Sequence, residues 1–298
     1  MIKDTEYRYW NNLSPGGNYM SFKVVVDSCG ELTKEMKESG NFVTASLTMQ
    51  LDDQIFVDDE TFDQKDFLEK IAASPNCPKS SCPSPEIYKE AFDDPADHIY
   101  AVTLSSELSG SYNSAQLGRN LLLEEKPEKK VYVFNSRSAS VGETLIALKI
   151  QELEEQGLEF EEVVRQVEEY IAEQNTFFVL ENLETLRKNG RLSNIKAFVA
   201  NALKIKPVMV STPEGTIVQL DKARGINKAL VKMVNYIVEK TDHPEEKILA
   251  ISHCNCPDRA EVVKEALQEQ LNVKEIIVLD TAGISTMYAN DGGIIVVV

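Results

Sequence analysis

FKVVVDSCGELTKEMKES, residues 22–39, is the stretch that decides the fold. Its first six residues form an apolar, β-branched run that is typical of a buried strand, and Ser28 and Gly30 close it. The residues that follow carry Leu32 and Met36 at helical spacing. A buried strand followed at once by an amphipathic helix predicts a β-loop-α unit.

The same pattern recurs further along the first half of the chain. HIYAVTL, residues 98–104, precedes a predicted helix near residues 110–123, and VYVF, residues 131–134, precedes one near residues 142–153. Between the first two units, residues 43–59 predict an extended pair that an Asp-Asp turn joins. Strands that alternate with helices predict a parallel sheet covered on both faces.

The second half begins with the predicted strand TFFVLE, and it continues with a helix that ends near Leu203. Two strands around KPVMV and GTIVQL then form a hairpin at the turn of residues 213–215, so this half predicts a mixed sheet. We therefore expect a two-domain α/β fold. Its predicted parts are an N-terminal extension at 1–21, a parallel-sheet domain at 22–174 and a mixed-sheet domain at 175–298.

Charge narrows the classes of partner. The chain has 31 basic and 48 acidic residues, a net charge of -17. This field repels phosphate backbones, so nucleic acid is not an expected partner. An anionic ligand stays compatible with it, because a buried site is governed by its own local donors.

The expected cellular compartment follows from the absence of a membrane-spanning segment and of a signal sequence. No stretch reaches the roughly 20 apolar residues that a membrane-spanning helix needs, and the N-terminus carries no apolar signal core. The five cysteines form no regular framework and fit reduced thiols. We therefore expect a cytoplasmic protein without transmembrane segments.

Hydroxyl side chains gather at two junctions between strands and helices. In an open α/β sheet such junctions lie at the carboxyl ends of the strands, where ligands bind. SSCPSP, residues 80–85, offers Ser80 and Ser81 on a proline-stiffened loop, and SSELSGSY, residues 105–112, offers Ser106 and a predicted helix N-cap at Ser109. Free N–H groups at that helix start could receive an oxyanion. The plain alternatives are a connector and a cap.

Two arginines lie in loops next to predicted helix starts. Arg191 is part of NGRLSN and Arg224 precedes GIN. Each could pair with a carboxylate, in two parallel hydrogen bonds if the geometry allows. The plain alternative for each is a surface cation.

Catalytic and metal-binding readings have less support. None of the three histidines is adjacent to a convincing nucleophile, and no G-x-S-x-G motif is present. HCNC, residues 253–256, lacks a second pair of ligands at zinc spacing. We expect no metal and no cofactor.

Taken together, these segments resemble the DegV family of bacterial fatty-acid-binding proteins from about Lys23 to the C-terminus. SSCPSP stands where the family has T-S-Q-P-S, LSSELSGSYNSA stands for L-S-S-x-L-S-G-T-Y, and LRKNGRLSN for L-x-K-G-G-R-I-S. Further matches are VVVDSCGEL, VFNSRSASVG for D-S-x-x-x-S-x-G, LKIKPV and KARGINKAL. Seven matching strings in the right order make the resemblance specific.

The resemblance implies two α/β domains that enclose a long-chain fatty acid, with its chain in an apolar tunnel and its carboxylate at the hydroxyl loops. It also implies a partner, a fatty acid kinase subunit that phosphorylates the carboxylate with ATP. Matching the motifs residue by residue implies ligand contacts for Ser80, Ser109, Arg191 and Arg224. Ser81 and Ser106 lie in the same loops.

One segment departs from the family pattern. Near the C-terminus the family has H-x-G-P-G, whereas this chain has YANDGG, with Ala289 at the histidine position and Asp291 at a glycine position. We therefore expect the carboxylate to be held differently, with Tyr288 or Asn290 as candidate donors.

The first hypothesis is thus a fatty-acid carrier without catalytic activity of its own. A second is a serine hydrolase or acyltransferase with Ser109 or Ser106 as nucleophile, which would need a general base. A third is a binding module for a small anion that is not a lipid.

Overall fold

The computed structural model of the chain describes residues 20–192 and 204–298. Most of the predicted extension at 1–21 and the predicted helix that ends near Leu203 therefore lie outside the described residues. The division into two domains at residue 174 stays a prediction.

The first sheet is parallel throughout and has the strand order β2-β1-β6-β7. Its strands are β1 (Phe22–Asp27), β2 (Phe42–Ala45), β6 (His98–Thr103) and β7 (Lys130–Asn135). Alternate residues of β1 enter two different cores, because side chains of a strand point to opposite faces. Val24 and Val26 pack with one set of helices, whereas Val25 packs with the other.

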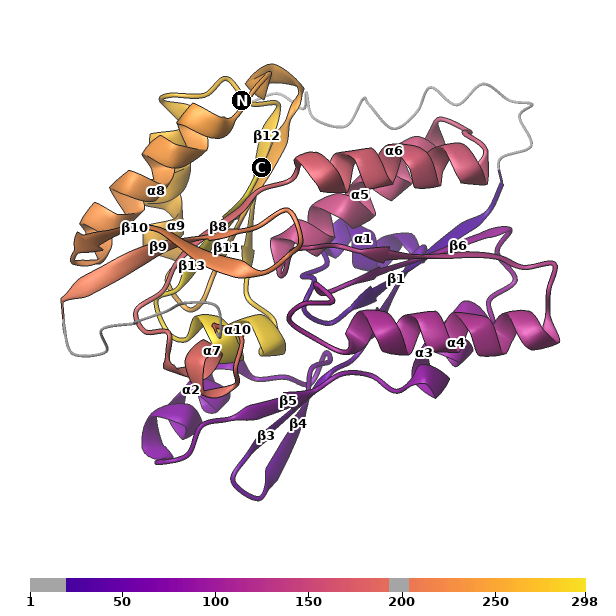
Figure 1. Cartoon of the computed structure of the whole chain (residues 1–298), viewed down its shortest axis with the longest axis horizontal. Helices are drawn as coiled ribbons and strands as arrows, with labels where there is room; N and C mark the ends of the chain where they lie inside the picture. The colour runs from indigo at the N-terminus through magenta and orange to yellow at the C-terminus, as the bar shows by residue number, and fades with distance from the viewer. Residues whose placement is uncertain (1–19, 193–203) are drawn as a thin grey trace, which may run out of the picture.

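Helices cover both faces of this sheet, as predicted (Figure 1). The face of Val24 and Val26 is covered by α1 (Lys34–Ser39), α5 (Val141–Glu155) and α6 (Phe160–Glu173). The face of Val25 is covered by α3 (Pro85–Phe92) and α4 (Ser111–Glu125).

The second sheet is mixed and has the order β10-β9-β8-β13-β11-β12, with only β11 and β12 parallel. Its strands are β8 (Thr176–Val179), β9 (Ile205–Ser211), β10 (Ile217–Arg224), β11 (Ile248–His253), β12 (Glu275–Asp280) and β13 (Ile294–Val297). α8 (Ile226–Lys240) and α9 (Pro257–Gln268) pack on one face. The other face packs against α5, so the two sheets meet across this helix.

A small third sheet has the order β4-β3-β5, with β3 (Thr48–Leu51), β4 (Gln54–Val57) and β5 (Lys79–Ser81). The turn at Asp52 and Asp53 between β3 and β4 confirms the predicted Asp-Asp turn. Three helices lie nearby, namely α2 (Gln64–Ala73), α7 (Glu184–Lys188) and α10 (Gly283–Ala289). The remaining short element is the 3₁₀ turn η1 (Pro244–Glu246).

Two local expectations are wrong, and one helix was not predicted. The predicted loop at 80–85 contains the end of β5 and the start of α3, whose N-cap is Ser84 with Pro85 at the first helical position. This is a known start signal, since proline lacks the N–H that a first turn leaves unpaired. The predicted N-cap Ser109 is also wrong: Gly110 is the N-cap of α4. The helix α10 was not predicted, because GISTMYA has no polar face.

In the described part of the chain, no helix is long and apolar enough to cross a membrane.

Candidate functional site

A pocket of about 750 Å³, its open side included, lies where the first and second sheets meet. Its apolar wall comes from loops, strands and helices of both halves of the chain: Leu104, Leu108, Phe178, Leu180, Leu186, Ile217, Ile284 and Ile295. Leu104 follows β6 and Ile217 begins β10, so distant segments form one lining.

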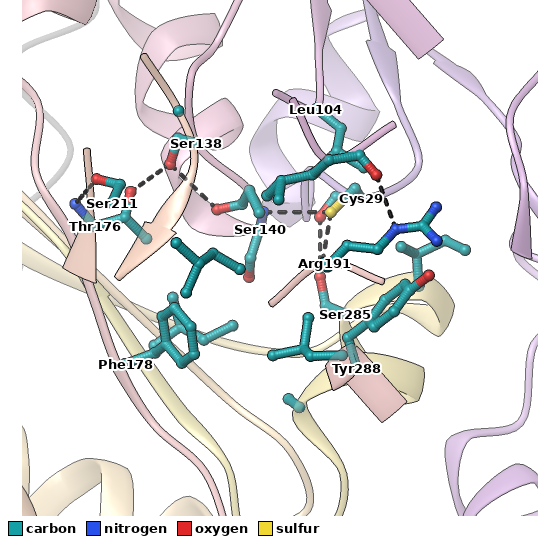
Figure 2. A pocket seen from close by; sticks show the side chains of 18 of the residues that line it. Cys29, Leu104, Ser138, Ser140, Thr176, Phe178, Arg191, Ser211, Ser285 and Tyr288 are labelled. Atoms are coloured by element: carbon teal, nitrogen blue, oxygen red, sulfur yellow. Dashed lines mark hydrogen bonds between the residues drawn. The ribbon is translucent and has the colours of Figure 1, made fainter. Parts of the chain in front are cut away.

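Hydroxyl side chains also line the pocket, but they bond to one another or to the protein rather than point free donors into it (Figure 2). Ser138 Oγ and Thr176 Oγ1 are 2.5 Å apart, Ser140 Oγ donates to Glu31, and Ser285 Oγ donates to the carbonyl oxygen of Cys29. The pocket therefore offers mainly carbon atoms to an occupant.

Tyr288 and Arg191 line one end of the pocket, opposite Thr176 in Figure 2. Together with Ser80, which contacts Tyr288, they are here called the Ser80–Tyr288–Arg191 cluster. The hydroxyl oxygens of Ser80 and Tyr288 are 2.9 Å apart, and the guanidinium carbon of Arg191 lies 5.8 Å from the centre of the Tyr288 ring. Arg191 Nε donates to the carbonyl of Leu108 at 3.0 Å, which ties this arginine to the second serine segment.

Tyr288 is held in place by the anchoring of α10. Asp58, which follows β4, accepts hydrogen bonds from the N–H groups of Gly283 at 2.7 Å and Ile284 at 2.9 Å. Burial raises the pKa of Asp58 to about 6, although these two donors favour its charged form. Asp58 thus pairs two of the N–H groups that the first turn of α10, the helix that carries Tyr288, would otherwise leave free.

Asp27, at the carboxyl end of β1, fixes the segment that contains Leu108. Its Oδ2 accepts from the N–H of Leu104 at 2.8 Å and from the hydroxyl of Ser111 at 2.6 Å. Burial raises the pKa of Asp27 and, together with the nearby Asp27 charge, raises that of Glu143. A buried carboxyl therefore holds both ends of the 104–111 segment behind the pocket.

The structure brings together only part of the predicted site. Ser80 and Arg191 lie in the cluster. Ser109 follows Leu108, whose carbonyl accepts from Arg191, and the Ser109 Oγ accepts from the N–H of Ser111 at 3.2 Å. Ser81 is exposed on the opposite side of β5 from Ser80. The two side chains point to opposite faces, because neighbouring residues of a strand alternate. A ligand contact by Ser81 stays a prediction.

Ser106 and Arg224 do not line the pocket. The Ser106 Oγ accepts from Asn135 Nδ2 at 2.8 Å, so its hydroxyl serves the loop after β7. Arg224 is exposed at the end of β10 and pairs across the hairpin with Ile205. A ligand contact by Ser106 or Arg224 therefore stays a prediction.

The structure also shows where the side chains of the YANDGG segment lie. Ala289 lines the pocket, whereas Asp291 points away from it and accepts from Asn255 Nδ2 at 2.9 Å. Asn290 Nδ2 lies 3.4 Å from Thr185 Oγ1, so of the two candidate donors only Tyr288 lies in the cluster.

No group of three or more histidine, cysteine or acidic side chains that could hold a metal occurs within residues 20–192 and 204–298. The five cysteines are free thiols. The N–H of Cys256 donates to Nδ1 of His253 at 3.4 Å, and the two side chains do not belong to a larger group of metal ligands in this part of the chain.

Sequence reasoning missed several pocket residues. Cys29, Thr176 and Ser285 line the pocket, but they lie in segments that read as a turn, a strand start and an apolar run. The only available signal was their position just beyond strand ends, or at a strand start facing them, where ligands bind in α/β sheets.

Known proteins are similar to this chain in sequence and in fold. The family model "Uncharacterised protein, DegV family" matches residues 21–298. A DegV domain-containing protein of Streptococcus pneumoniae strain R6 is 35% identical over 278 residues, which are 93% of this chain and 98% of the relative.

Two solved structures are similar over the same span. A DegV-family protein from Ruminococcus gnavus, refined with vaccenic acid, is 59% identical with a TM-score of 0.91 and covers 94% of this chain and 99% of its own. The Streptococcus pneumoniae Fatty Acid Kinase (Fak) B3 protein, loaded with linoleic acid, is 33% identical with a TM-score of 0.84 and covers 93% of this chain and 99% of its own. The chain matches in family model, sequence and fold, and it therefore belongs to the DegV family.

Proposed function

We propose that this protein binds a long-chain fatty acid, with the acyl chain in the pocket and the carboxylate at the Ser80–Tyr288–Arg191 cluster. The observation that carries the proposal is an apolar pocket that reaches a guanidinium group at one end. An acyl chain needs the first and a carboxylate needs the second, because a charge brought out of water must be paired.

The energies favour this arrangement. An acyl chain of about 14 to 16 buried methylenes contributes roughly 0.8 kcal/mol for each, before ordering costs are subtracted. The pocket hydroxyls already have partners, so burying the chain leaves few of their donors newly unpaired. The vaccenic acid in the Ruminococcus gnavus relative supports the same class of ligand for this chain.

Native mass spectrometry of the freshly purified protein, with analysis of the denatured extract, tests the proposal. We expect a fatty acid in the extract, or tight binding when the emptied protein is titrated with one. If the extract holds no fatty acid and none binds, the proposal is wrong; a small anion other than a lipid in the extract would favour the third hypothesis.

We further propose that the bound acid is presented to a kinase subunit. In this step a carboxylate oxygen attacks the γ-phosphorus of ATP, ADP leaves and an acyl phosphate forms. The name of the Fatty Acid Kinase B3 relative supports it. Incubation of the loaded protein with ATP and the Streptococcus pneumoniae kinase subunit, followed by trapping with hydroxylamine, should give a fatty hydroxamate. The protein without the subunit is the control and should give none.

A serine hydrolase has weaker support. Ser106 is bonded to Asn135 and Ser109 to the N–H of Ser111, whereas the buried His98 pairs with Glu154 and His253 lies 3.4 Å from Asp280. The third histidine, His243, is exposed and lies 3.9 Å from Glu245, so no histidine of the described residues lies against either hydroxyl as a general base. The carrier is the function that the geometry favours.

Replacing Tyr288 with phenylalanine should weaken fatty-acid binding about 3- to 10-fold, because it removes one neutral donor worth about 1 kcal/mol. Isothermal titration with a single fatty acid measures the change. Tyr236→Phe is the matched control, since Tyr236 bonds to Asp221 away from the pocket. Equal affinity of the Tyr288→Phe variant and the wild type would remove Tyr288 from the proposed carboxylate site.

A further inference from the structure

The hairpin of β3 and β4 projects from the rest of the molecule (Figure 1). β4 is the edge of the third sheet, and within the described ranges no strand pairs with its outer side. Its two outward side chains are apolar: Ile55 is 71% exposed and Val57 is 42% exposed. Exposed edge strands are usually protected by lysine or proline, and QIFV has neither.

The surroundings of this edge are strongly acidic. The exposed acids lie at both ends of β4, in the hairpin turn and in the segment that leads to α2: Asp52, Asp53, Asp59, Glu60 and Asp63. Lys70 of α2 pairs with Asp66 and lies 5.2 Å from the centre of the Phe56 ring. The outer edge of β4 therefore combines unpaired backbone groups, two apolar side chains and negative charge.

This combination selects the kind of partner. If two copies of the chain paired antiparallel through β4, the acids at one end of each strand would meet those at the other end of its neighbour, which like charges oppose. An extended segment that alternates basic and apolar residues meets the same edge with opposite charge. Such a segment adds a strand through main-chain hydrogen bonds, with its side chains giving specificity.

The third sheet also touches the candidate site. β5 carries Ser80, which bonds to Tyr288, and a side chain added at Gly283 of α10 would meet Met49 of β3. A protein that docks on β4 is thus joined through one three-stranded sheet to the residues that we assign to the carboxylate.

We propose that β4 is a docking strand for a basic, extended segment of the partner protein that acts on the bound acid. The task of that partner rests on the proposed function, but the docking itself does not. A shallow hollow beside the hairpin, lined by Asp52, Gln54 and Lys70 among others, gives room for a side chain of that segment.

A synthetic ten-residue peptide that alternates lysine with valine is the probe. Fluorescence anisotropy should show that it binds the full chain at low ionic strength and that salt weakens the binding, because the attraction is partly electrostatic. A variant with Ile55→Lys and Val57→Lys should bind at least tenfold more weakly. Ile55→Thr with Val57→Thr, which keeps β-branched residues and adds no charge, should also lose affinity.

The matched control carries the same two added charges elsewhere, at Ile87→Lys and Val262→Lys, where the side chains are 44% and 63% exposed. This control has the same net charge as the Ile55→Lys, Val57→Lys variant, and its affinity for the peptide should be clearly higher than that of the β4 variant. Equal losses in the control and the β4 variant would mean general charge attraction and would overturn the proposal. So would equal binding of a peptide that is N-methylated at alternate residues, since it cannot pair as a strand.

Two further measurements distinguish the docking strand from a dimer interface and from the fatty-acid site. Light scattering that detects a dimer lost on Ile55→Lys would assign the edge to a second copy and overturn the proposal. Fatty-acid titration of the β4 variant should be unchanged. Peptide binding by a protein that binds no fatty acid would contradict the proposed function and still support the docking strand.

Discussion

The Glu31→Gln variant is expected to gain about 3 kcal/mol in free energy of unfolding, relative to the wild type, when the pH is raised from 4.5 to 8. Glu31 is 5% exposed and lies where the halves of the chain meet: Ser140 Oγ donates to it at 2.8 Å, and the N–H of Ala282 lies 3.4 Å from it. Burial raises its pKa from the ordinary 4.5 to about 7, against the hydrogen bonds from Ser285 and Ser140.

The sign follows from proton linkage. The folded chain holds the Glu31 proton up to about pH 7, whereas the unfolded chain releases it near 4.5. The stability that this proton contributes is complete below pH 4.5 and is lost as the pH rises to about 7. A shift of this size corresponds to about 3 kcal/mol. Glutamine stays neutral at every pH, so the free energy of unfolding of the variant should not fall by this amount between pH 4.5 and about 7.

Urea unfolding of both proteins between pH 4.5 and 8 measures the effect. Asp58 contributes a similar slope up to about pH 6 in both proteins, since its pKa is also raised by burial, and so cancels in the comparison. Glu38→Gln at an exposed position is the control and should run parallel to the wild type. A Glu31→Gln curve that is also parallel would mean that Glu31 is ionised in the folded protein at neutral pH.

The second large effect concerns Arg191, whose replacement by methionine should weaken fatty-acid binding about 10- to 100-fold. A hydrogen bond to a charged group contributes about 1.5–3 kcal/mol, and methionine keeps much of the side chain's length and apolar stem. Because Arg191 Nε also donates to Leu108, a smaller loss of folding stability is expected as well, and unfolding at the same pH measures it separately.

Two variants make the Arg191 result specific. Arg191→Lys keeps the charge but loses the planar donor pair, so its affinity should fall between those of the wild type and Arg191→Met. Arg224→Met removes an exposed arginine outside the pocket and should leave the affinity unchanged. If Arg224→Met lost as much affinity as Arg191→Met, the carboxylate would not lie at the Ser80–Tyr288–Arg191 cluster.

The sequence by itself determined the elements and their class. Residues 22–27 form a strand with the predicted bounds, because the apolar run and the turn residues that close it are local properties. The alternation of strands and helices in the first half was enough for a parallel sheet covered on both faces. The hairpin at residues 213–215 was equally local.

The sequence also identified two members of the cluster, Ser80 and Arg191, through motifs that are short and contiguous. It could not separate them from Ser81, Ser106 and Arg224. Whether a hydroxyl faces a pocket depends on which side of a strand it occupies and on the partner that packs opposite, and Ser106 finds Asn135 from a segment 29 residues away.

Only the tertiary structure decided which segments meet. Ser80, Arg191 and Tyr288 come from β5, from the turn after α7 and from α10, and no local pattern relates positions so far apart in the chain. Their meeting depends on long-range packing, in which Asp58 and Asp27 hold α10 and the 104–111 segment by buried hydrogen bonds. Local propensity therefore gave the elements, and buried polar contacts between distant elements gave the site.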